Sequence, residues 1–142
     1  MTWKAWLQLR PWRRHSLVLA VAGAVYIAVG AVYISVPLTH DRSAGLALPL
    51  HYAPAQVWGV VWVMVGVLAV ISTRWPPPNE TWGYTILAAL AAFWAAAYAL
   101  SIALLHAPHS GLSGVLVWAL VAFLWWGISG LRNPNDSEGS RG

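Results

Sequence analysis

Residues 16–38 read SLVLAVAGAVYIAVGAVYISVPL, an apolar run that contains no Asp, Glu, Lys, Arg or His. A helix that crosses a bilayer needs about 20 mostly apolar residues, so this stretch predicts a transmembrane helix. Three more stretches of the same kind follow, at residues 53–72, 82–105 and 111–131. The sequence therefore predicts an all-α membrane protein, with four transmembrane helices in an antiparallel bundle over residues 16–131.

The composition agrees with a membrane protein and excludes several other classes. Of the 142 residues, 59% are hydrophobic and 8% are charged, whereas a soluble domain has about 25% charged residues. Cysteine is absent, which excludes disulfides, thiolate metal sites and a Cys nucleophile. The spans also lack the ionisable residues that coupled transporters place in the membrane. We expect no enzymatic activity, no cofactor and no nucleic-acid partner.

The basic residues are sorted to one side of the predicted spans. Of the eight Lys and Arg residues, only Arg42 lies on the opposite side. The other seven are Lys4, Arg10, Arg13, Arg14, Arg74, Arg132 and Arg141. By the positive-inside rule, we expect a multi-pass protein of the cytoplasmic (inner) membrane with both termini in the cytoplasm. We expect the first span to be an uncleaved signal anchor, since its apolar run is too long for a cleaved signal.

The two ends of the chain are predicted to lie outside the bundle. Residues 1–15 interleave tryptophan and leucine with Lys4, Arg10, Arg13 and Arg14, a pattern typical of a short interfacial segment that is attracted to anionic lipid. We favour a topology anchor over membrane perturbation or partner docking. The tail, residues 132–142, is polar and expected to be disordered. The loop at 39–52 includes apolar residues 44–50, which we expect to lie on the membrane surface.

The first span contains a tandem heptad, GAVYIAV at residues 23–29 followed by GAVYISV at residues 30–36. The repeat places Gly23 above Gly30 on the helix, and the second span has the same spacing between Gly59 and Gly66. Small residues allow membrane helices to approach closely. We therefore predict helix packing at these four glycines. The glycines can pack against another helix of the same chain, against another copy in a homo-oligomer, or against both.

Two sets of residues are candidates for a ligand site. Four histidines fall on the predicted outer side, which is enough imidazoles for zinc or copper; they are His40, His51, His106 and His109. Because residues 106–109 form a Pro-containing turn rather than a helix face, we favour ordinary loop residues over a metal site. The deep tryptophans Trp62, Trp94 and Trp118 either line a lipid- or quinone-sized pocket or, as we favour, pack in the core.

Taken together, these segments resemble the small four-span membrane proteins of actinobacteria and their bacteriophages, some of which are described as holins. The resemblance is carried by Arg14–Ser16, VWGVVW at 57–62, STRWPPPNETWGY at 72–84 and VWALVAFLWWGISG at 117–130. It implies a short, helical, oligomeric protein without catalytic residues. The chain departs from many holins in that its basic residues are concentrated at the N-terminus rather than in the C-terminal tail.

Three functions fit these features. The first is a holin-like protein that oligomerises in the bacterial cytoplasmic membrane and permeabilises it. The second is a structural or accessory membrane protein that docks a partner through residues 1–15 or the tail. The third is a binder of a small ligand, such as lipid, quinone or metal.

Overall fold

The structure is a computed structural model and describes residues 14–37, 39, 43, 45–74 and 80–130. Within these residues lie four helices that are long and apolar enough to cross a membrane. The elements are α1 (Arg14–Ser35), α3 (Ala47–Tyr52), α4 (Ala55–Ser72), α5 (Glu80–Leu105), the 3-10 helix η2 (His109–Gly111) and α6 (Leu112–Ser129). The prediction of an all-α, four-span fold is confirmed.

Prolines bound two of the long helices in the way that their chemistry dictates. The first helix ends at Ser35, two residues before Pro37, because proline disfavours helical geometry in the residue before it. Pro54 is the N-cap of α4, with φ −65° and ψ 158°. Its missing N–H is not needed at that position. The predicted spans thus agree with the observed helices to within three residues at each end.

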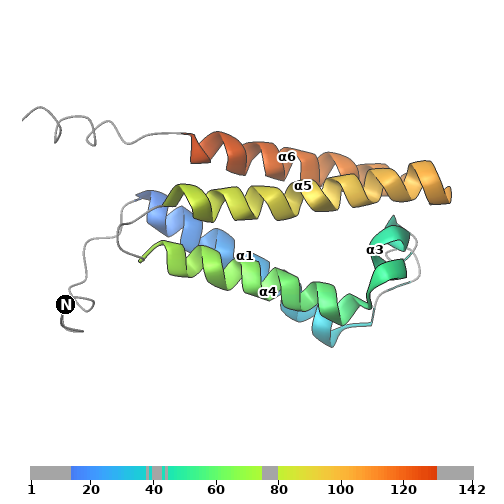
Figure 1. The fold of residues 1–142 in the computed structure, drawn as a ribbon, viewed down its shortest axis with the longest axis horizontal. Coiled ribbons are helices and arrows are strands. Elements are labelled where there is room, and N and C mark those ends of the chain that lie inside the picture. The colour runs from blue at the N-terminus through green and yellow to red at the C-terminus, as the bar shows by residue number, and fades with distance from the viewer. Residues whose placement is uncertain (1–13, 38, 40–42, 44, 75–79, 131–142) are drawn as a thin grey trace, which may run out of the picture.

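The four long helices form two layers (Figure 1). One layer is the antiparallel pair α1 and α4, and the other is the antiparallel pair α5 and α6. Contact between the layers runs chiefly from α4 to α5, with less from α1 to α5. The start of α1 and the end of α6 lie at the same end of the molecule, as expected for an even number of spans.

At the opposite end of the bundle, residues 47–52 form a short helix, α3, within the loop that we expected to lie on the membrane surface. It is attached to two long helices by hydrogen bonds. The backbone N–H of Leu48 donates to Ser101 Oγ of α5 at 3.1 Å, and Trp58 Nε1 of α4 donates to the Pro49 carbonyl at 3.0 Å. Leu46, just before α3, is fully buried. This segment is therefore part of the folded bundle.

Candidate functional site

Helices α1 and α4 approach each other closely at the four glycines of the heptad pattern. A Cβ built on Gly30 would lie 2.5 Å from the Gly59 carbonyl oxygen, and one on Gly66 would lie 2.5 Å from the Gly23 carbonyl oxygen. Because these obstacles are backbone atoms, no rotamer change can relieve them. The structure thus pairs Gly23 with Gly66 and Gly30 with Gly59 inside one chain.

The tyrosines of the same heptads point toward the other layer. Tyr33 stacks on Trp94 of α5 with ring centroids 5.9 Å apart, while the Tyr26 ring lies against Trp62 of α4, in its own layer, at 4.8 Å. The Tyr26 hydroxyl donates to the Leu87 carbonyl of α5 at 3.1 Å. Each heptad therefore contributes a glycine to the α1–α4 contact and a tyrosine to the contact between layers.

The centre of the bundle is filled by indole rings. Trp62 of α4 and Trp94 of α5 are buried, at 0% and 1% exposure, and their rings stack with centroids 5.9 Å apart. Trp118 of α6 also contacts Trp62, with ring centroids 5.0 Å apart. Among the described residues, the buried indole N–H groups of Trp62, Trp94 and Trp125 have no hydrogen-bond partner. Trp62 and Trp94 thus pack in the core, as we favoured for the deep tryptophans.

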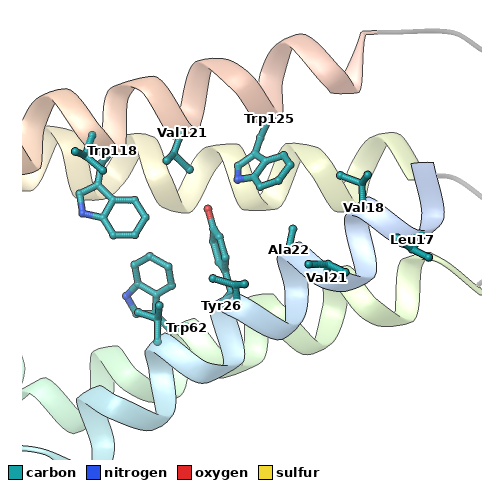
Figure 2. A pocket seen from close by; sticks show the side chains of 12 residues that line it. Leu17, Val18, Val21, Ala22, Tyr26, Trp62, Trp118, Val121 and Trp125 are labelled. Atoms are coloured by element: carbon teal, nitrogen blue, oxygen red, sulfur yellow. The ribbon is translucent and has the colours of Figure 1, made fainter. Parts of the chain in front are cut away.

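Between α1 and α6 lies a pocket of about 470 Å³ (Figure 2). It exists because α1 packs on α4 while α6 packs on α5, so the two outer helices face each other without closing the space. Aliphatic side chains form most of the α1 wall, together with Tyr26, and Trp62 closes one end. The α1 residues are Leu17, Val18, Val21, Ala22, Val25, Tyr26 and Val29.

The α6 wall of the pocket is half aromatic. It consists of Val117, Trp118, Val121 and Trp125, and the Tyr26 hydroxyl points between the two indoles (Figure 2). Almost none of the surface inside the pocket is polar. The residues from Leu17 to Val29 span about 18 Å along the helix axis, at about 1.5 Å per residue. This is close to the thickness of one leaflet, which is half of a hydrocarbon core of about 30 Å.

The histidines that we predicted on the outer side do not assemble into a metal site in the part of the chain that is described. No group of three His, Asp or Glu side chains lies close enough there to hold a metal ion. His40 lies outside the described residues, and His51, His106 and His109 are exposed. His106 has a positive φ of 53°, and Ala107 N–H then donates to the Ser101 carbonyl at 3.2 Å. This hydrogen bond thus ties the link between α5 and α6 back to the last turns of α5.

The basic residues that we predicted to meet anionic lipid fall mostly beyond the described part. Lys4, Arg10 and Arg13 lie outside the described residues, as do residues 1–12 of the interfacial segment and the tail at 132–142. Arg14 is the first residue of α1. Its backbone therefore lies three residues, or about 4.5 Å, from Leu17 at the near end of the pocket.

Sequence reasoning missed the α1–α6 pocket as a site, although it named Trp62 and Trp118 as possible lining. The available signal was the concentration of aromatic side chains on one face of α6, at Trp118 and Trp125. Comparison of the chain with protein-family models, curated proteins and solved structures finds no match.

Proposed function

We propose that this is a small integral membrane protein of holin type, which self-associates in the bacterial cytoplasmic membrane and permeabilises it. The observation that supports this most is the uncovered surface of α6. No residue within Leu112–Ser129 is buried. Leu116 and Phe123 are 70% and 64% exposed, and with Leu120 and Gly127 they recur at the spacing of one helix face. We call this set the outward face of α6.

A single copy offers no route for ions, which is why the proposal requires several copies. The centre of the bundle is occupied by Trp62, Trp94 and Trp118, and none of the spans contains a charged residue. An ion is very costly to place in such an interior. Permeabilisation would have to occur between copies or through the lipid around them, and the outward face of α6 is available for that contact.

Inducible expression in a bacterium tests the proposal. We expect growth to stop abruptly after a delay. A voltage-sensitive dye should report loss of the membrane potential at the same time. The delay reflects the accumulation of copies to the level at which they assemble. Normal growth at high expression, with the protein present in the membrane fraction, would refute permeabilisation.

The outward face is tested by Gly127→Leu. A Cβ at Gly127 would meet no described atom within 4 Å, so the larger side chain does not disturb the bundle itself. We expect it to block close approach of a second helix and to delay or abolish the loss of potential. Ala89→Leu, at an exposed position of α5, is the matched control and should behave as the wild type. If both variants behaved as the wild type, copies would not meet through this face.

We further propose that both termini lie in the cytoplasm, in line with the seven basic residues on that side. Because the chain has no cysteine, single-cysteine labelling is unambiguous. Ser110→Cys, at the exposed link between α5 and α6, should react with a membrane-impermeant maleimide in intact spheroplasts. Arg74→Cys, exposed after α4, should react only after the membrane is opened. The reverse pattern would refute the orientation.

A further inference from the structure

The pocket between α1 and α6 is not used by the proposed self-association, which involves the opposite side of α6. We propose that it binds one acyl chain of an anionic phospholipid, with the headgroup at the level of the first turn of α1. This is a lipid site within a single copy of the chain, and it does not depend on whether copies assemble or permeabilise the membrane.

The dimensions of the pocket fit one hydrocarbon chain. A volume of about 470 Å³ over a length of about 18 Å gives a mean cross-section of about 26 Å². A hydrocarbon chain in van der Waals contact with its surroundings, at about 4 Å between carbons, needs a channel with a cross-section on the order of 20 Å². The pocket therefore accepts one extended chain, along about the depth that one leaflet occupies.

The chemistry of the lining favours a hydrocarbon chain over a quinone ring. Quinone carbonyls need hydrogen-bond donors, and the surface inside this pocket is almost entirely apolar. The Tyr26 proton is already donated to the Leu87 carbonyl. The indole nitrogens of Trp62 and Trp125, two residues that line the pocket, have no partner among the described residues, but both nitrogens are buried and offer almost no surface to a ligand. What remains is a wall of valine side chains facing Trp118 and Trp125 (Figure 2), which contacts a flexible chain along its length.

The position of the pocket favours a negative headgroup. Its near end begins at Leu17, three residues after α1 starts at Arg14. The start of a helix carries a partial positive charge and unpaired N–H groups. The sequence before it adds Lys4, Arg10 and Arg13, and basic residues beside a span attract anionic lipid. A lipid with its chain in the pocket thus has its phosphate at the level of the first turn of α1, which directly follows these basic residues in the sequence.

Native mass spectrometry of the full chain tests this site. The protein is released from nanodiscs that contain equal amounts of phosphatidylglycerol and phosphatidylcholine with the same acyl chains. We expect one phosphatidylglycerol to stay bound per chain, with a preference of about tenfold over phosphatidylcholine. Ala22→Phe should fill the pocket and reduce the bound fraction about tenfold. Ala28→Phe, at an exposed position of α1 outside the pocket, should leave the bound fraction unchanged.

Two further variants keep the outcome interpretable. Val21 lines the pocket but is 56% exposed, so Val21→Trp should obstruct the pocket without entering the core, even if Ala22→Phe does not fold. Arg14→Gln should reduce the preference for phosphatidylglycerol while a lipid still binds. Retention of lipid by both pocket variants would overturn the site. Equal retention of the two lipids by the wild type, or a co-purified isoprenoid in place of phospholipid, would overturn the assigned ligand.

Discussion

The contact between α1 and α4 predicts that Gly30→Ala destabilises the protein. The added Cβ would lie 2.5 Å from the Gly59 carbonyl oxygen and 2.8 Å from the Val63 backbone nitrogen, whereas ordinary contact begins at 3.4 Å. The helices must therefore separate by about 0.9 Å at this point, the difference between 3.4 and 2.5 Å. Because both obstacles are backbone atoms, the separation extends along the rigid helices and loosens the Gly23–Gly66 contact as well.

The expected cost follows from two opposing terms. Adding a methyl group to a well-packed contact costs about 1–3 kcal/mol, and a backbone obstacle places Gly30→Ala at the upper end of that range. Alanine returns about 1 kcal/mol through its better helix propensity. We therefore expect a net loss of about 2 kcal/mol in the free energy of unfolding, the difference between about 3 and about 1 kcal/mol.

Titration with sodium dodecyl sulfate in mixed micelles, followed by far-UV circular dichroism, measures this loss. The matched control is Gly127→Ala on α6, where a Cβ meets no described atom within 4 Å. We expect this control to be neutral or to gain up to about 1 kcal/mol. If Gly30→Ala and Gly127→Ala unfolded at the same detergent fraction, α1 and α4 would not approach as closely as the structure has them.

The remaining predictions concern contacts between other elements. Tyr26→Phe removes the hydrogen bond to the Leu87 carbonyl and should cost about 0.6 kcal/mol, the typical value for such bonds between membrane helices. Tyr52→Phe, at a residue that is 79% exposed, should have no effect in the same titration, and equal midpoints for the two variants would contradict the contact. Ser101→Ala removes the acceptor of the Leu48 N–H. Hydrogen exchange at that amide should then accelerate while α5 stays protected, and an unchanged exchange rate at Leu48 would show that α3 is held by other contacts.

The four spans could be predicted from the sequence because each depends on local properties, namely length, apolar composition and flanking prolines. The packing role of the glycines was also accessible, since close approach in lipid needs small residues. The partner of each glycine stayed open, because the same small residues serve contacts within one chain and between copies. In the structure, two antiparallel neighbours with glycines seven residues apart bring both pairs into register, Gly23 with Gly66 and Gly30 with Gly59.

The pocket could not be predicted, because it depends on how two finished hairpins meet. Bulky rings at Trp62 and Trp118 set the distance between the layers, and no local pattern shows which side of the bundle is left unfilled. Helix α3 was missed for a different reason. It has six residues, far fewer than are stable as an isolated helix in water. It depends on bonds to Trp58, nine residues from its partner Pro49, and to Ser101, 53 residues from its partner Leu48.

The two-layer arrangement has a consequence for the order of events during synthesis. The α1–α4 pair is complete once residue 74 has been made, and 63 of the 142 residues, those from 80 onward, belong to the second layer and the tail. At about 5–20 residues per second, those residues take about 3–13 s to translate. The first hairpin therefore has seconds alone in the bilayer in which to bring its glycines together. Helices α5 and α6 then insert beside an α1–α4 hairpin whose register is already set. The rate of translation is therefore one of the factors that determine how this bundle assembles.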